Sequence, residues 1–376
     1  MTQSTKSEQI TYVPGPDENG WKGTAARLLQ ASGLLSSLVK STASALLRNN
    51  QYRCAILYYH RIGTGGVPVY NGIPADVFES QIRFLRQNYR IISLAQFCQE
   101  FPEGKVAEPS VVITFDDGYR GTYTEALPIL QKYSVPATVY LTVGCIETGD
   151  IAWYDKIFLA FYIAEAEGID VEVEEELLHF PLSSLRDRLG SALRLIRRLR
   201  QIPNVDRIDF CRKFDKQFPL PSTETRGRML TWEEARQMQK LGISFGGHTM
   251  THPAVSQLSP PEAEIELGES KAIAEKRLGQ RVVDFAFPFG NLQACGTGTP
   301  ALLKKFEYRS ATTTMEGVNS GDADPFLLRR TAVIEEAGVS LAMFRLNQLF
   351  RRGSNERLTQ TSAAQETQAS LREMHA

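Results

Sequence analysis

The middle of the chain alternates short apolar runs with amphipathic segments. The apolar runs are rich in β-branched residues and are typical of buried strands, at 54–60, 90–92, 111–115, 137–143, 243–245 and 281–287. Between them, apolar residues recur at helical spacing, and we expect helices at 78–88, 123–133 and 260–278 and others that begin after Ser93 and Thr231. Alternating strands and helices predict an α/β fold with a parallel sheet or barrel.

The segments outside this alternation differ in composition. Residues 1–49 combine a Pro- and Gly-containing polar leader with an amphipathic helix at 25–47, which we expect to pack on the domain rather than on a membrane surface. Charged, helix-prone sequence at about 153–228 predicts a helical insertion within one domain that spans 50–335. A C-terminal helix is expected within 336–353, and 354–376 resembles a disordered tail.

Composition and charge exclude several classes of protein. The 376 residues are 42% hydrophobic, which suffices for a large core. Lys and Arg number 42 against 43 Asp and Glu, so no overall basic excess indicates a nucleic-acid partner. The five cysteines are scattered without CxxC spacing, which argues against a disulfide framework or a cysteine zinc site. Neither a signal peptide nor a membrane span is evident, so we expect a cytoplasmic protein, with peripheral membrane contact left open.

Acidic and imidazole side chains follow two of the expected strands. Asp116 and Asp117 come directly after the strand at 111–115, and in α/β folds that end of the sheet carries the chemistry. His248 and His252 follow a later strand, and on a helical turn their spacing would place both rings on one side. One Asp and two His form a three-ligand shell that leaves a coordination position for water. Read alone, the same residues are also compatible with a plain turn and an incidental histidine pair.

These residues resemble a known family. The sequences TFDDG at 114–118 and HTMTH at 248–252 are similar to the first two motifs of the polysaccharide deacetylases, carbohydrate esterase family 4 with its NodB-homology domain. The resemblance covers about residues 50–335 and implies a distorted (β/α) barrel and metal-dependent hydrolysis of N-acetyl groups on amino sugars. By position it implies Asp116 as general base and Asp117, His248 and His252 as ligands of a divalent metal. The expected metal is zinc, and cobalt and nickel are the alternatives.

The third family motif is incomplete. Pro288, Phe289 and Gly290 are present, but Ala286 stands where the family has an arginine that orients the base. Its role would pass to another residue, and the candidates are the two adjacent arginines at 329 and 330. Phe289 is the expected backbone oxyanion donor. Phe289 and Tyr119 are the aromatic residues expected to contact the substrate. Trp153, Trp232 and Phe287 could also stack on a sugar ring, with a place in the core as the alternative for all of these aromatics.

A histidine near the start of the domain completes the resemblance. The sequence YYH at 58–60 resembles the permuted branch of the family, similar to the biofilm poly-N-acetylglucosamine deacetylases, in which the histidine strand comes first. His60 would then be the general acid that protonates the leaving amine. The alternative is a core histidine at the end of a strand.

The sequence leaves three functions open. The first is a deacetylase of an N-acetylated poly- or oligosaccharide, lipid-linked precursors included, in cell-wall or exopolysaccharide biosynthesis. The second is an amidohydrolase acting on a small non-sugar amide, and the third is a catalytically inactive glycan-binding member, which Ala286 makes conceivable. The basic run at 186–200 is typical of a solvated face, with contact to an anionic substrate or partner as the alternative.

Overall fold

The computed structural model describes residues 53–63, 72–103, 108–222 and 228–333, together with Leu346 and Phe350. Contacts divide the chain into Met1–Leu46 and Leu47–Ala376, and all of the described residues belong to the second unit. The expected leader and first helix, the C-terminal helix apart from those two residues, and the tail lie outside the described residues. Within the described part, no helix is both long and apolar enough to cross a membrane.

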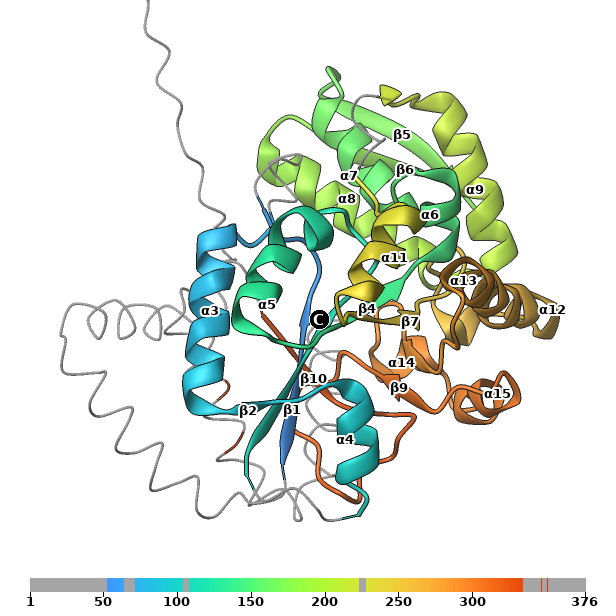
Figure 1. The fold of residues 1–376 in the computed structure, drawn as a ribbon. Helices are drawn as coiled ribbons and strands as arrows, with labels where there is room; N and C mark the ends of the chain where they lie inside the picture. Colours follow the sequence, from blue (N-terminus) through green and yellow to red (C-terminus); the bar gives the residue numbers. More distant parts are fainter. Residues whose placement is uncertain are drawn as a thin grey trace, which may run out of the picture. The chain divides into compact units, whose positions relative to one another are not determined.

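One parallel sheet forms the centre of the described unit (Figure 1). Seven of its eight strands follow the order β10-β1-β3-β4-β7-β8-β9, and β2 pairs with β3 outside that path. An isolated parallel bridge between Thr312 and Leu328 links the two ends of the path, so the sheet is a nearly closed barrel. The predicted (β/α) barrel is confirmed. The strands are β1 (Cys54–Tyr59), β2 (Arg90–Ile91), β3 (Ser110–Phe115), β4 (Thr138–Leu141), β7 (Ser244–Gly247), β8 (Asp284–Ala286), β9 (Ser310–Thr312) and β10 (Arg330–Ala332).

Two strands were not predicted. β9 and β10 are only three residues long, and each pairs with one long-range neighbour, β8 and β1 respectively. Neither contains a run of β-branched residues, so local pattern alone does not identify them. Their pairing is set by closure of the barrel.

Helices surround the barrel (Figure 1). Three of the expected helices begin with a capping box. The capping residues are Ser93, Thr231 and Ser259. The expected helix at 260–278 contains a π-helical segment, η4, and a second π-helical segment, η2, precedes α5. The helical elements are α3 (Ala75–Asn88), α4 (Leu94–Glu100), η2 (Thr122–Ala126), α5 (Leu127–Tyr133), α6 (Val143–Thr148), α11 (Trp232–Lys240), η3 (Val255–Gln257), α12 (Pro260–Ala263), η4 (Glu264–Glu269), α13 (Ser270–Leu278), α14 (Leu292–Cys295) and α15 (Thr299–Lys305).

The strands present their side chains alternately to two cores. Along β1, Ala55, Leu57 and Tyr59 belong to the large core that the helices share with the outside of the sheet. Cys54 and Ile56 belong to a second cluster, which also contains Tyr140 and Ala286 from other strands. Because neighbouring strand residues point to opposite faces, this second cluster fills the barrel interior. The barrel interior is therefore filled by this small apolar cluster.

The insertion is not wholly helical. It comprises α7 (Trp153–Ile163), β5 (Gly168–Val173), β6 (Glu176–Pro181), α8 (Leu185–Leu199) and α9 (Asn204–Gln217), which lie together at the top of Figure 1. β5 and β6 form an antiparallel hairpin, so the prediction of a helical insertion was wrong at 168–181. Ile169, Val171 and Val173 alternate with acidic residues there, and this period of two outweighs the helix propensity of the glutamates.

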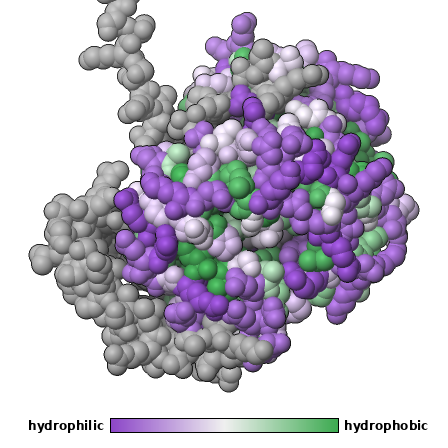
Figure 2. Space-filling model, in the orientation of Figure 1, coloured by the Kyte–Doolittle hydropathy of each residue, from purple (hydrophilic) through white to green (hydrophobic). Residues whose placement is uncertain are grey.

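The visible surface is mainly hydrophilic. Figure 2 shows hydrophobic residues in small separate patches on this face, surrounded by hydrophilic ones. The amphipathic helices thus turn their apolar sides inward, as in α8, whose buried residues include Leu195, Ile196 and Leu199.

Candidate active site

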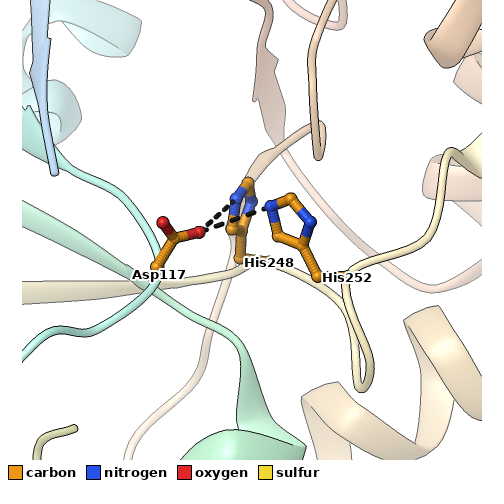
Figure 3. Close-up of side chains that lie close together, drawn as sticks. All are labelled: Asp117, His248 and His252. Carbon is orange, nitrogen blue, oxygen red and sulfur yellow. Dashed lines mark ion pairs between the residues drawn. The ribbon is translucent and has the colours of Figure 1, made fainter. Parts of the chain in front are cut away.

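Asp117, His248 and His252 lie together just beyond the carboxyl ends of β3 and β7 (Figure 3). Asp117 Oδ1 is 3.3 Å from His248 Nε2 and 3.3 Å from His252 Nε2. One ligand atom of each residue lies within 4.8 Å of the others, and all three residues are buried. The fold thus brings together side chains from two distant parts of the sequence.

The spacing of these atoms fits a small divalent cation. Ligands about 2.1 Å from a tetrahedral zinc ion lie about 3.4 Å apart, close to the two distances between Asp117 and the histidines. Asp117 Oδ1 is also a buried oxygen that accepts no hydrogen bond from the described residues, and such an atom needs a partner. Carboxylate oxygen and imidazole nitrogen are donors that suit zinc and its neighbours. The three residues therefore fit a metal of this class.

Both imidazoles can offer a lone pair to a metal. His248 Nδ1 lies 2.7 Å from the carbonyl oxygen of Ala286, and because a carbonyl only accepts, Nδ1 is the donor. In the neutral ring this leaves the lone pair on Nε2, the atom that faces Asp117. Burial lowers the pKa of His252 to about 4, so that ring is neutral near pH 7.

The two histidines lie on a loop, and the predicted helical turn was wrong. β7 ends at Gly247, and the φ angles of Thr249 and His252 are 67° and 58°, in the left-handed region that an α-helix excludes. Thr249 Oγ1 accepts a hydrogen bond from His252 N–H at 2.9 Å and donates one to His248 C=O at 2.5 Å. This tight turn, rather than helical spacing, brings the two rings together.

Left-handed backbone is concentrated at the site. Eight described non-glycine residues have positive φ, and four of them lie here, namely Asp117, Thr249, His252 and Phe289. Each such conformation costs about 1–3 kcal/mol, so surrounding contacts must hold it in place. Strain of this kind is typical of functional sites, where side chains are fixed in advance.

A buried glutamate fixes the histidine loop. Glu266, 2% exposed on η4, accepts hydrogen bonds from the backbone N–H groups of Met250 and Thr251 at 2.9 and 2.8 Å and from the Thr251 hydroxyl. These bonds give the backbone N–H groups of the turn between the two histidines a buried acceptor. Local sequence pattern does not indicate the role of Glu266, because its contact with the histidine loop spans about fifteen residues and two elements. Only the π-helical segment that carries Glu266 marks the position as unusual.

We expect Glu266→Ala to weaken metal binding about 10- to 100-fold, because the loop that holds His252 loses its buried acceptor. Zinc titration of the wild type and the variant, each freed of metal, measures this. Glu264→Ala is the matched control, since that neighbour pairs only with exposed Lys305 among the described residues. Equal zinc affinity in the wild type and Glu266→Ala would contradict the anchoring role.

Asp116 forms a buried ion pair with Arg330. The two carboxylate oxygens of Asp116 accept from Nη1 and Nη2 of Arg330, each at 2.7 Å, and Arg330 is fully buried. Burial favours the neutral acid, but the charge and the hydrogen bonds of Arg330 lower the pKa of Asp116. Asp116 is therefore a carboxylate near neutral pH, fixed beside the three candidate metal ligands.

Arg330 reaches Asp116 from inside the barrel. It is the first residue of β10, in register with Ile56 of β1, and its guanidinium lies 4.5 Å from the Tyr58 ring centroid. Arg330 Nε donates to the carbonyl of Thr313 at 2.7 Å. Arg329, the other sequence candidate, is exposed and donates to the carbonyl of Glu316 instead. The guanidinium expected at position 286 thus comes from a different strand.

Phe289 lies against His252, one of the three candidate metal ligands. Its ring centroid is 4.8 Å from that of His252, its φ is 61°, and none of the described residues accepts a hydrogen bond from its N–H. That N–H remains available as the expected oxyanion donor. Tyr119, by contrast, is buried and donates its hydroxyl to Asp155 at 2.7 Å, so its ring is not presented to a substrate in this structure.

His60 lies just beyond the end of β1 and is exposed. It is not the buried core histidine of the alternative interpretation. Tyr59, the residue before it, is in register with Phe115 of β3, and the carbonyl of Tyr59 accepts from the N–H of Asp116 at 2.9 Å. The structure therefore puts an accessible imidazole on the same side of the barrel as the two aspartates.

The first turn of α7 contacts the histidine loop, and Trp153 was the one residue of this turn that the sequence offered as a candidate for sugar stacking. Trp153 Nε1 donates to the carbonyl of His252 at 3.1 Å, and the Tyr154 ring centroid is 4.8 Å from that of His252. Asp155 accepts from Arg61, the residue after His60, at 2.5 Å. A cluster of aromatic residues at the start of an otherwise charged insertion is the signal that could have indicated these contacts.

Comparison with known proteins agrees with this geometry. The family model described as polysaccharide deacetylase matches residues 103–310, more than half of the chain. The match includes Asp116, Asp117, His248 and His252, and His60 and Arg330 lie outside it. A Bacillus subtilis protein, YxkH, assigned by name to the polysaccharide deacetylases, is 21% identical over 280 residues, which are 74% of this chain and 70% of the relative.

Shorter matches have higher identity. A poly-β-1,6-N-acetyl-D-glucosamine N-deacetylase of Escherichia coli is 40% identical over 74 residues, 19% of this chain and 11% of that protein. A Staphylococcus aureus enzyme of the same name is 40% identical over 68 residues, 18% of this chain and 23% of that protein. The chain thus matches less than a quarter of the length of either of these relatives.

Solved structures agree on the fold. The Streptococcus pyogenes deacetylase PplD superimposes with a TM-score of 0.53 at 20% identity, covering 79% of this chain and 98% of that one. IcaB from Ammonifex degensii gives a TM-score of 0.50 at 19% identity, covering 78% and 97%. The family match over more than half of the chain identifies it as a member of the polysaccharide deacetylase family, hydrolases of carbon–nitrogen bonds other than peptide bonds.

Proposed function

We propose that this protein is a metal-dependent deacetylase that hydrolyses the N-acetyl groups of an amino-sugar poly- or oligosaccharide. The observation that carries the proposal is the pairing of two features within one buried site: a three-ligand cluster that fits a divalent cation, and a carboxylate ionised by Arg330 beside it. The 40% identity to poly-N-acetylglucosamine deacetylases supports N-acetylglucosamine as the sugar type.

Each group has a role in the proposed mechanism. A divalent cation, zinc in the first instance, held by Asp117, His248 and His252 would supply a Lewis acid and acidify a water molecule. Asp116 accepts the proton of the attacking water, and Arg330 keeps that carboxylate ionised and oriented. The N–H of Phe289 donates to the oxygen of the scissile carbonyl as negative charge develops on it.

His60 completes the cycle as the general acid. Amide hydrolysis expels an amine, which is a poor leaving group unless it is protonated as the bond breaks. His60 is an exposed imidazole at the end of β1, which pairs with β3, the strand that the two aspartates follow. We assign it the protonation of the departing sugar nitrogen.

We expect His60→Ala to reduce the rate on an N-acetyl sugar about 10²- to 10⁴-fold and the rate on an activated acetyl ester far less, because only the amine leaving group needs a proton. Acetate release from a chitooligosaccharide and nitrophenol release from nitrophenyl acetate measure the two rates. His179→Ala is the control, since this exposed histidine lies on the hairpin and pairs with Asp170. Equal losses on both substrates would refute the acid role.

The inactive alternative loses its main support in this structure. It rested on Ala286, because a base without its arginine would be poorly oriented. Arg330 makes the same kind of bidentate contact with Asp116 from β10. Acetate release by zinc-loaded protein from chitooligosaccharides, but not from small cyclic amides, would support the saccharide deacetylase over the amidohydrolase. The reverse result would contradict the proposal.

A further inference from the structure

Arg200 places a positive charge beside the active site without a carboxylate partner among the described residues. It lies directly after α8, and its guanidinium carbon is 3.9 Å from the ring centroid of Phe289. The Phe289 ring is in turn 4.8 Å from the His252 ring. Burial and the neighbouring charge of Arg197 both lower the pKa of Arg200. Partial burial of an uncompensated cation is unfavourable, so its position calls for an explanation.

Three other buried or half-buried arginines of the insertion have oxygen acceptors. Arg188 donates to three backbone carbonyls, and Arg198 pairs with Glu174 at 2.7 Å. Arg207, which lies over the Trp153 ring, donates to the side chains of Asn204 and Thr251. These contacts explain why those arginines are there. The backbone N–H of Arg200 donates to the carbonyl of Ile196, but no oxygen of the described residues accepts a hydrogen bond from its guanidinium. Stacking on Phe289 uses only one face of that guanidinium.

The neighbouring charges are already balanced. Asp116 pairs with Arg330, and Asp155 pairs with Arg61. Arg207 lies within electrostatic range of Glu266. Arg200 is thus the cation on this side of the site whose charge the described residues leave uncompensated. Since guanidinium groups bind carboxylates and phosphates in a bidentate manner, an anionic ligand group would satisfy it.

We propose that Arg200 binds an anionic group of the substrate, a carboxylate or a phosphate, carried close to the N-acetyl group that is hydrolysed. The inference deepens the proposed function and rests on it. A sugar whose acetamido group reaches His252 lies next to Phe289, and Arg200 stacks on the same ring. The insertion would in this way select acidic or phosphorylated saccharides over neutral ones.

Three forms of one oligosaccharide test this selection. They are N-acetylchitotetraose, N-acetylchitotetraose with its primary alcohols oxidised to carboxylates, and N-acetylchitotetraose 6-phosphate. We expect the zinc-loaded wild type to prefer at least one anionic form over the neutral one by about tenfold in kcat/KM. Arg200→Gln should lower kcat/KM on that form about 10- to 100-fold, a much larger loss than on the neutral form. The form on which Arg200→Gln loses kcat/KM, carboxylate or phosphate, identifies the anionic group that Arg200 binds.

Controls separate a binding role from a structural one. Arg197→Gln removes the same charge from the exposed neighbouring position and should leave all three rates unchanged. Arg200→Lys keeps the charge and should restore part of the preference. Equal losses on neutral and anionic forms in Arg200→Gln, or no preference in the wild type, would overturn the inference.

Binding of the three oligosaccharides measured by calorimetry distinguishes failure of the Arg200 inference from failure of the proposed function. If the wild type releases no acetate from any form, the deacetylase proposal fails. Tighter binding of an anionic form that Arg200→Gln abolishes would still support the anion site. Binding that is equal for all forms would overturn it.

Discussion

Asp116→Asn is expected to lower kcat/KM for acetate release about 10²- to 10⁴-fold, because an amide cannot take the proton of the attacking water. The variant has nearly the same shape, and its amide oxygen can still accept one of the two hydrogen bonds of Arg330. Bound zinc should therefore remain at the wild-type level. Acetate release and elemental analysis of the same preparation measure both quantities.

Asp117→Asn is the matched control for this prediction. It changes the adjacent aspartate in the same way, but it should lose zinc and activity together, because Asp117 Oδ1 is the atom that faces both histidines. Loss of zinc in Asp116→Asn, or full activity in that variant, would show that base and ligand have been assigned to the wrong residues.

Arg330→Met is expected to lower the free energy of unfolding by about 3–5 kcal/mol, because it leaves the Asp116 carboxylate buried without a counter-charge. It should also lower kcat, since Asp116 would no longer be held ionised and in place. Arg330→Lys keeps the charge but cannot donate two parallel hydrogen bonds, so its losses should be smaller. Urea unfolding and acetate release measure the two effects.

Arg329→Met supplies the control for Arg330. Its side chain is exposed and, among the described residues, donates only to the carbonyl of Glu316, so neither stability nor activity should change appreciably. If Arg330→Met were as stable and active as the wild type, the buried ion pair would have no part in preparing the base.

The parts of the site that sequence predicted share one property: each directly follows a strand with a clear apolar pattern. Asp116 and Asp117 follow β3, His248 follows β7, and His60 follows β1. Because parallel strands end at one edge of the barrel, the chain order alone indicates that these side chains converge.

Residues that act through long-range contacts were harder to predict. Arg330 begins a three-residue strand whose pairing with β1 appears only once the barrel is closed. Glu266 and the first turn of α7 reach the histidine loop from separate elements. The loop itself was misread as a helical turn, because the left-handed conformations of Thr249 and His252 depend on side-chain hydrogen bonds that spacing does not encode.

The position of Arg330 also has a physical explanation. Ala286 lies in the interior cluster of the barrel beside Tyr140, and the guanidinium of Arg330 lies 5.8 Å from the Tyr140 ring centroid. The residue on β8 is too short to reach Asp116, and β10 supplies a long side chain that does. The site keeps its arginine contact while the strand that supplies it changes.

The most direct test of the proposed metal centre is anomalous X-ray scattering at the zinc edge from crystals of zinc-loaded protein. We predict one peak within bonding distance of Asp117 Oδ1, His248 Nε2 and His252 Nε2. With these three side chains arranged as in Figure 3, no peak between them, or a zinc ion bound only elsewhere, would contradict the account.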